Sequence, residues 1–194
     1  FIGNHSSGKM GFDIANEAAK LGAEVILVSG PTHQTTKYSS IKVVKVVSAE
    51  EMYQACLTYY KNVDVAICAA AVADYKPKVV AEQKIKKSEA EFSITLEKTK
   101  DILASLGKEK IHQFLIGFAL ETENEIENAK LKIQKKNLDL IVLNSLKDEG
   151  AGFGKSTNKV TFIDKNFNIE PRELKSKELV AEDILEKVIL NFNN

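Results

Sequence analysis

The strongest constraint on the fold of this chain is an alternation, along its 194 residues, of short apolar runs and longer segments with helical periodicity. The apolar runs occupy residues 23–29, 41–47, 63–71, 114–120 and 138–143. The helical segments occupy about residues 10–21, 48–60, 123–136 and 175 onward. Strands that alternate with helices form mostly parallel sheets covered on both faces by the crossover helices. We therefore predict a single doubly wound, Rossmann-like α/β domain over residues 1–194, with a mostly parallel central sheet.

Two segments refine this prediction. Residues 63–71 are the most apolar run, with Asp64 as their single charge, which predicts a buried strand in a central position. Residues 74–89 are rich in Lys, Pro, Glu and Gln, which indicates a long basic connection of the kind that often carries function. Ser48 and Glu51 form a capping box at the start of a helix. Shorter elements complete the pattern: strands at 92–96 and 159–163, a helix at about 101–106 and an irregular segment at 145–158.

Composition narrows the classes of partner. Lys plus Arg and Asp plus Glu are equal at 27 each, so net charge gives no reason to expect nucleic acid or an acidic membrane surface. No apolar run reaches the roughly 18 residues of a membrane span. The two cysteines and three histidines show no metal-site or disulfide spacing, so we expect a cytoplasmic protein without a metal site of its own. The chain begins at Phe1 inside an apparent strand, and we expect a fragment that lacks its extreme N-terminus.

The first loop, residues 3–11, has the glycines and helix start that receive phosphate groups through free backbone N–H groups. Three interpretations compete. A Walker A motif fits Gly3 through Lys9, but Met10 stands where Ser or Thr should hold magnesium. A dinucleotide-binding oxidoreductase fits the glycines, but its Tyr-x-x-x-Lys pattern, at Tyr38, comes too early in the chain. The glycines could also serve only to allow a tight turn between strand and helix.

Five motifs in order along the chain favour a more specific interpretation. They are Asn4 to Gly11 with Val28 to Pro31, Ala69 to Tyr75, Lys84 to Lys87, Gly117 to Thr122, and Lys132 to Asn144. Together they cover almost the whole chain, which resembles the phosphopantothenoylcysteine synthetase family. This family, also called phosphopantothenate–cysteine ligase, supplies the ligase domain of the bacterial bifunctional coenzyme A biosynthesis protein.

The resemblance implies an acid–amino-acid ligase that joins 4'-phosphopantothenate to L-cysteine. CTP in bacterial members, or ATP in eukaryotic ones, activates the carboxylate as an acyl-nucleotide, and the cysteine amine then displaces the nucleoside monophosphate. The resemblance also implies Mg²⁺ that enters with the nucleotide, a homodimer with the active site near the dimer contact, and a flavin-dependent decarboxylase fused upstream in many bacteria. An NAD(P)-binding oxidoreductase or nucleotide-binding module remains the alternative.

The family's functional residues map onto this sequence position by position. The resemblance implies catalytic roles for two of them: Asn4 would handle the acyl-nucleotide, and Lys84 would lie in a flap that closes over the nucleotide. The nucleotide-binding positions are Ser6, Ser7, Gly8, Lys9, Cys68, Ala69, Ala70, Asp74, Lys84, Lys100, Asp101, Ile102, Leu103, Phe118, Lys132 and Lys136. The substrate-binding positions are Asn4, Ala70, Ala71 and Asp74. Lys100 replaces a proline of the family pattern.

Each of these residues also has a structural interpretation. Asn4 can shape its loop through an Asx turn, and Ser6 or Ser7 can cap the following helix. Asp74 can cap a loop, and a Phe in an apolar strand, such as Phe118, more often belongs to the core. Lys132 and Lys136 are one helical turn apart and therefore share a face, whereas lysines 84, 86 and 87 alone would indicate only a solvated loop.

Overall fold

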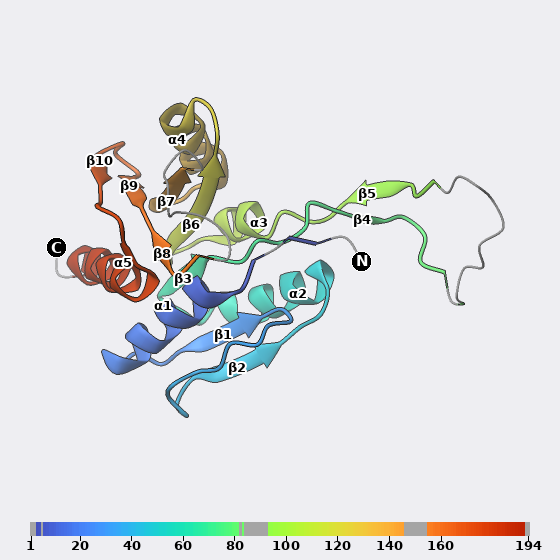
Figure 1. The fold of residues 1–194 in the computed structure, drawn as a ribbon, viewed down its shortest axis with the longest axis horizontal. Coiled ribbons are helices and arrows are strands. Elements are labelled where there is room, and N and C mark those ends of the chain that lie inside the picture. Colours follow the sequence, from blue (N-terminus) through green and yellow to red (C-terminus); the bar gives the residue numbers. More distant parts are fainter. Residues whose placement is uncertain (1–2, 5, 82, 84–92, 146–154, 193–194) are drawn as a thin grey trace.

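The structure is a computed structural model that describes residues 3–4, 6–81, 83, 93–145 and 155–192. Its largest sheet has five strands in the order β10-β9-β7-β6-β3 (Figure 1). These strands are β3 (Val65–Cys68), β6 (Phe114–Glu121), β7 (Leu140–Ser145), β9 (Val160–Asp164) and β10 (Ile169–Pro171). β3, β6 and β7 are parallel, and β9 and β10 are antiparallel to their neighbours. The predicted α/β fold with a mostly parallel sheet is confirmed.

The predicted central position of residues 63–71 is wrong. β3 lies at the edge of the five-stranded sheet, and β1 (Ile26–Ser29) and β2 (Lys42–Lys45) form a separate parallel pair. All four residues of β3 are only half-buried, whereas half of β6 and most of β7 are buried. An apolar run indicates that helices cover both faces of a strand. It does not indicate which strands lie beside that strand.

Helices cover the two faces of the sheet. α1 (Lys9–Lys20) and α5 (Lys177–Phe192) pack together on one face, and α3 (Ile102–Glu109) and α4 (Glu125–Lys136) pack on the other (Figure 1). The side chains of successive residues of β7 pack on opposite faces of the sheet. Leu140 and Val142 join the core beneath α1 and α5, while Ile141 and Leu143 join the core beneath α3 and α4. Full burial of such a side chain stabilises the fold by roughly 1.5–3 kcal/mol.

Helix α2 (Ala49–Tyr60) begins where the capping box predicts. The Ser48 hydroxyl accepts a hydrogen bond from the Glu51 backbone N–H at 3.2 Å. The Glu51 carboxylate in turn accepts the Val47 N–H at 2.9 Å. These reciprocal bonds occupy donors that the start of a helix leaves free. The helix then packs against β1 and α3.

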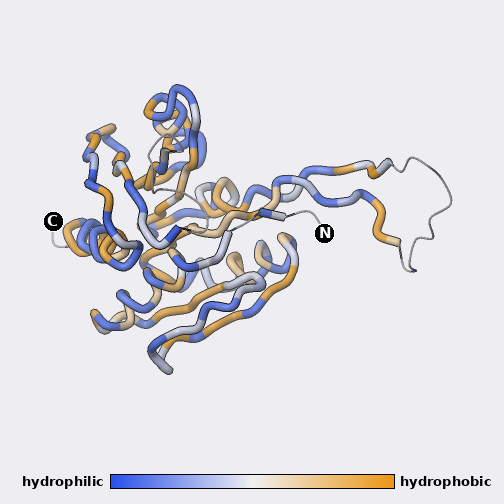
Figure 2. Tube along the Cα trace, in the orientation of Figure 1, coloured by the Kyte–Doolittle hydropathy of each residue, from blue (hydrophilic) through white to orange (hydrophobic). Residues whose placement is uncertain are grey.

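A two-stranded arm projects from the body at the carboxyl end of β3 (Figure 1). It consists of β4 (Tyr75–Pro77) and β5 (Leu96–Lys98), paired antiparallel with Tyr75 opposite Lys98. The predicted strand at 92–96 is therefore misplaced, because the pairing with β4 fixes the strand at 96–98. Apolar residues lie along the outer part of the arm as well as in the body (Figure 2).

A short antiparallel pair precedes the last helix. β8 (Thr157–Asn158) pairs with β11 (Lys175–Ser176), so α5 begins at Lys177 and not at 175 as the sequence predicts. Within the described part of the chain, none of the helices combines the length and apolar character that a membrane span requires.

Candidate functional site

The first loop is tied to the carboxyl end of β3. The Asn4 side-chain amide donates to the Ala71 carbonyl at 2.9 Å. Thr32, which follows β1, donates its hydroxyl to the Ser7 carbonyl at 2.7 Å. The loop therefore bridges the carboxyl ends of two strands, where open α/β sheets bind ligands.

The same loop leads into α1 through a left-handed glycine. Gly8 has φ 78°, which favours glycine because a side chain would be strained there. Ser6 and Ser7 hydroxyls lie 3.4 Å from the Gly8 and Lys9 N–H groups respectively, so both serines do contribute to the turn. No side chain caps α1 and its first turn carries no acidic residue, which leaves a positive helix terminus suited to phosphate.

Lys9, at the start of α1, is engaged by two carboxylates. Its ammonium lies 2.9 Å from Asp13 in the same helix and also contacts Glu178 of α5. Burial works to lower the pKa of Lys9, but these two carboxylates outweigh it and raise the pKa above its ordinary value. A phosphate at this helix start would therefore meet a fully charged lysine.

The end of β3 and the segment after it contribute backbone groups and one thiol. Ala70 and Asp74 are exposed, and the Asp74 and Ala73 carbonyls accept hydrogen bonds from the backbone and hydroxyl of Thr99. Burial raises the pKa of the Cys68 thiol to about 12, and the neighbouring Cys56 contributes to the rise. The Cys68 thiol thus stays protonated at neutral pH, which argues against its use as a nucleophile.

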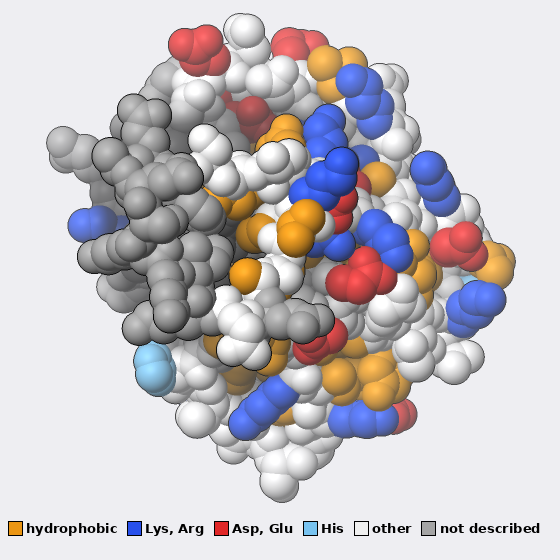
Figure 3. Space-filling view, turned by 90° about the vertical axis from the view of Figure 1, so that its right-hand side faces the viewer, with side chains coloured by type: hydrophobic (Ala, Val, Ile, Leu, Met, Phe, Trp, Pro, Cys, Tyr) orange, Lys and Arg blue, Asp and Glu red, His pale blue; other side chains and the backbone are white. Residues whose placement is uncertain are grey.

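Each lysine that is predicted to bind nucleotide and that the structure describes contacts a carboxylate. Lys132 pairs with Glu121 at 2.5 Å, Lys136 with Asp101 at 2.8 Å, and Lys100 with Glu50 at 2.7 Å. Lys100 also lies 4.5 Å from the centre of the Tyr53 ring. Figure 3, which views the molecule from the side on which the arm projects, shows basic and acidic side chains next to one another on the surface. A triphosphate that binds these lysines must compete with the carboxylates.

Residues 100–103 serve the fold as well as the proposed site. Asp101 caps α3, because its carboxylate accepts the Ala104 N–H at 2.9 Å. Burial works to raise the pKa of Asp101, but the hydrogen bonds from Lys136 and Ala104 outweigh it and lower the pKa. Ile102 is buried, and Leu103 packs over Gly117, where a Cβ atom would lie 2.7 Å from the Leu103 Cδ2 atom.

Phe118 lies on the other face of β6. It is half-buried and packs with the core beneath α1 and α5, as do Met10 and Ala69. This partial burial fits the core interpretation and also leaves part of the ring accessible. Phe118 therefore belongs to the layer of α1 and α5, while Lys132 and Lys136 lie on α4 in the opposite layer.

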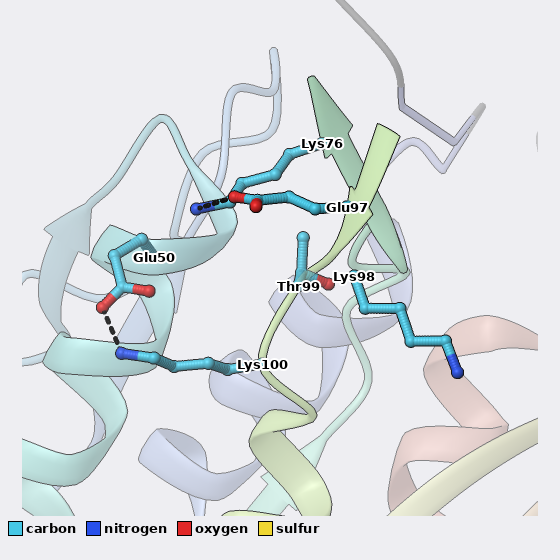
Figure 4. Close-up of a pocket in the computed structure, with 6 residues that line it drawn as sticks. All are labelled: Glu50, Lys76, Glu97, Lys98, Thr99 and Lys100. Atoms are coloured by element: carbon cyan, nitrogen blue, oxygen red, sulfur yellow. Dashed lines mark hydrogen bonds and ion pairs between the residues drawn. The ribbon is translucent and has the colours of Figure 1, made fainter. Parts of the chain in front are cut away.

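A shallow pocket of about 180 Å³ lies where the arm joins the body (Figure 4). Lys76 pairs with Glu97 at 3.4 Å across the two arm strands, and the Lys100–Glu50 pair lies beside them. Lys98 extends away from both pairs in Figure 4. The pocket is thus lined by the arm strands, Lys100 and Glu50 of α2.

Sequence reasoning missed the carboxylates that hold these lysines. These carboxylates come from other elements than the lysines they contact. Glu50 of α2 contacts Lys100, Glu121 at the end of β6 contacts Lys132, and Glu178 of α5 contacts Lys9. Glu121 alone carried a signal, since it ends an otherwise apolar strand. Lys84, which the resemblance makes catalytic, lies outside the described residues. Among the described residues, no three His, Cys, Asp or Glu side chains gather as a possible metal site.

Residues 1–191 match the family described as the DNA/pantothenate metabolism flavoprotein C-terminal domain. The chain belongs to this family. Its relatives include a cysteine/cysteine sulfinic acid decarboxylase from an unknown prokaryotic organism, 52% identical over 190 residues that cover 97% of this chain and 53% of the relative. The coenzyme A biosynthesis bifunctional protein CoaBC of Bacillus subtilis is 42% identical over 188 residues, which cover 97% of this chain and 46% of the relative.

A solved structure agrees with this assignment. The crystal structure of the C-terminal domain of a CoaBC protein superposes with a TM-score of 0.82 at 42% identity, and the match covers 97% of this chain and 84% of that one. The chain spans about half the length of the curated relatives that it matches. The comparisons therefore establish the family and the fold of this chain.

Proposed function

We propose that this chain is the ligase domain that joins 4'-phosphopantothenate to L-cysteine in coenzyme A biosynthesis. The observation that carries the proposal is the Asn4–Ala71 hydrogen bond, which places the motif asparagine of the first loop against the alanine-rich end of β3. Membership in the family, and similarity to CoaBC proteins named for coenzyme A biosynthesis, support the same conclusion.

The reaction has two steps. The carboxylate of 4'-phosphopantothenate attacks the α-phosphorus of CTP, and the P–O bond to pyrophosphate breaks. The amine of cysteine then attacks the carbonyl carbon of the acyl-cytidylate, loses a proton and releases CMP. Both steps need fixed hydrogen-bond donors and positive charge around phosphate groups and a developing oxyanion.

The described residues can supply these groups. The Asn4 side-chain amide donates one N–H to the Ala71 carbonyl. Its second N–H could donate to the acyl carbonyl, and its own carbonyl oxygen could accept from the amine. Three lysines would exchange their carboxylate partners for the triphosphate: Lys100, Lys132 and Lys136. The substrate site would be lined by Ala70, Ala71 and Asp74. The open start of α1, with Ser6, Ser7, Gly8 and Lys9, would receive a phosphate.

We also infer the accessory components. Mg²⁺ would enter with CTP and be held mainly by its phosphates, since magnesium in nucleotide sites keeps few protein ligands. Lys84 would close over the nucleotide. The free thiols Cys56 and Cys68 fit the reducing cytoplasm. A flavin-dependent decarboxylase would act on the product, either in the same polypeptide or separately.

A homodimer is the proposed assembly, and the arm is its proposed contact. Three large apolar residues of the arm are exposed: Val79 at 81%, Val80 at 79% and Ile94 at 55%. Monomeric proteins rarely present contiguous apolar surface of this kind. Since the arm starts at Asp74, a contact made through it would lie near the proposed active site.

The experiment that tests the function combines the chain with 4'-phosphopantothenate, cysteine, Mg²⁺ and each of the four nucleoside triphosphates. We expect pyrophosphate and CMP with CTP, and less product with ATP. Lys84→Gln should lower turnover by roughly a hundredfold or more without unfolding the chain, while Lys61→Gln at the exposed end of α2 should not. Absence of both products would refute the ligase. So would release of carbon dioxide from cysteine in place of amide formation.

A further inference from the structure

Thr99 joins the base of the arm to the segment that follows β3. Its backbone N–H donates to the Asp74 carbonyl at 2.9 Å, and its hydroxyl donates to the Ala73 carbonyl at 2.7 Å. The first bond extends the β4–β5 ladder by one residue beyond the Tyr75–Lys98 pair. The second bond is made by a side chain and lies outside the ladder. Thr99 therefore holds two successive carbonyls of the segment that contains the proposed substrate residues.

The segment from Ala70 to Asp74 is held from two directions. Asn4 of the first loop donates to the Ala71 carbonyl at 2.9 Å, two residues before the carbonyl that accepts the Thr99 hydroxyl. Ala70 and Asp74, at the two ends of the segment, are exposed. The direction of the exposed Asp74 carboxylate depends on the backbone that carries it, and Thr99 fixes this backbone. Loss of the hydroxyl would leave a carbonyl without its donor and the segment less restrained.

The residues that follow Thr99 hold it in place. Lys100 contacts Glu50 of α2 at 2.7 Å. The Asp101 carboxylate accepts the Ala104 N–H at 2.9 Å at the start of α3. A side chain can orient a site only where packing and hydrogen bonds restrain its own position. Thr99 meets this condition, because it is half-buried and its chain neighbours are tied to two helices of the body.

We propose that Thr99 is a positioning residue for the ligation. Its role is indirect: the hydroxyl fixes the backbone of Ala73 and Asp74, and this backbone sets where the Asp74 carboxylate and the neighbouring alanines meet 4'-phosphopantothenate and the acyl-cytidylate. Reactions of this kind depend on the placement of the groups around the reacting atoms, so a small displacement costs a large factor in rate. The inference rests on the proposed ligase function.

The test is Thr99→Val, which keeps the shape of the side chain, removes the hydroxyl and leaves the backbone bond to Asp74. With 4'-phosphopantothenate, cysteine and Mg²⁺–CTP at saturation, we expect kcat to fall by about tenfold or more. The KM for CTP should stay within about twofold of the wild-type value, because the lysines proposed to hold the triphosphate are unchanged. Thr99→Ser, which restores a hydroxyl, should recover most of the lost kcat.

Thr58→Val is the matched control. The Thr58 hydroxyl also donates to a backbone carbonyl, that of Gln54, at 2.8 Å, but this bond lies within α2 and is exposed. Thr58→Val therefore removes the same kind of hydrogen bond without touching the segment after β3, and it should keep the wild-type kcat. Thermal midpoints of all variants, measured alongside, separate a loss of rate from a loss of stability.

A wild-type kcat in Thr99→Val, with only a lower thermal midpoint, would show that Thr99 serves the fold alone and would overturn the inference. So would a Thr99→Val chain that does not fold, or a fall in kcat that Thr99→Ser does not recover or that Thr58→Val shares. A wild-type chain that yields neither CMP nor pyrophosphate would overturn the ligase proposal itself, and the inference with it.

Discussion

At the scale of single residues, carboxylates hold the described lysines of the candidate site, Lys9, Lys100, Lys132 and Lys136. Asp101 shows how one carboxylate can serve two purposes, since it caps α3 and also pairs with Lys136. The pairing orients Lys136 without removing its charge. A phosphate with more negative charge can then replace Asp101, while the helix keeps its cap.

Asp101→Asn isolates the ion pair, because asparagine is also a good helix cap. The folded-state pKa of Asp101 is lowered, so the stabilisation is present above the unfolded pKa of about 3.9 and disappears as pH falls through the lower folded value. The side chain is half-exposed, so we expect at most about 1 kcal/mol at pH 7. Urea unfolding of both proteins between pH 7 and pH 3 measures the difference.

The control for this measurement is Asp64→Asn. Asp64 lies at the opposite end of β3 with its side chain 82% exposed, so its replacement should change the free energy of unfolding little at any pH. If the Asp101→Asn difference stayed constant down to pH 3, the ion pair would not be its source.

At the scale of elements, the contact between α3 and α4 sets the position of the site lysines. Gly107 of α3 lies directly against the end of α4, where a Cβ atom would be 1.9 Å from the Lys136 carbonyl oxygen. The Asn137 amide donates to the Gly107 carbonyl at 3.0 Å and fixes the same contact. Because the obstructing atom belongs to the backbone, no rotamer change can relieve the clash.

Gly107→Ala should therefore destabilise the protein by about 3 kcal/mol, although the same change in an open helix stabilises by roughly 0.5–1 kcal/mol. Separation of the helices should also weaken CTP binding, because Lys136 would move away from Asp101. Thermal unfolding and CTP titration measure the two effects. Gly11→Ala in α1 is the control, since no atom lies within 4 Å of its added Cβ, and it should be neutral or stabilising in the unfolding measurement. A stable Gly107→Ala would contradict the contact.

The sequence predicted helices and strands well where they depend on interactions between residues that are close in sequence. The start of α2 followed from Ser48 and Glu51, and β7 from its continuous apolar run. Properties that depend on distant partners were not predictable. The edge position of β3 depends on which strands pair, and the place of β5 depends on its pairing with β4 across nearly twenty residues. For the same reason the sequence predicted Lys132 and Lys136 as site residues, but it did not predict their ion pairs with Glu121 and Asp101.

At the scale of the whole molecule, the body and the arm have different physical character. The body has a core of buried apolar residues in two layers, one on each face of the sheet. Within the described residues, the two arm strands pair only with each other, and Val79 and Val80 are almost fully exposed. Apolar surface that one chain leaves exposed to water can stabilise a dimer, because association of two chains buries it. The arm is therefore the place to test the proposed dimer.

The double variant Val79→Glu, Val80→Glu places two like charges in the proposed contact. We expect the wild type to sediment as a dimer at micromolar concentration and the variant as a monomer, because burying unpaired carboxylates is costly. Thermal unfolding of the body should change little, since neither valine belongs to the core. Ile111→Glu is the matched control: Ile111 is 82% exposed but precedes β6 at the opposite end of the sheet, so this variant should remain dimeric. A wild type that sediments as a monomer, or a double variant that stays dimeric, would remove the arm from the assembly.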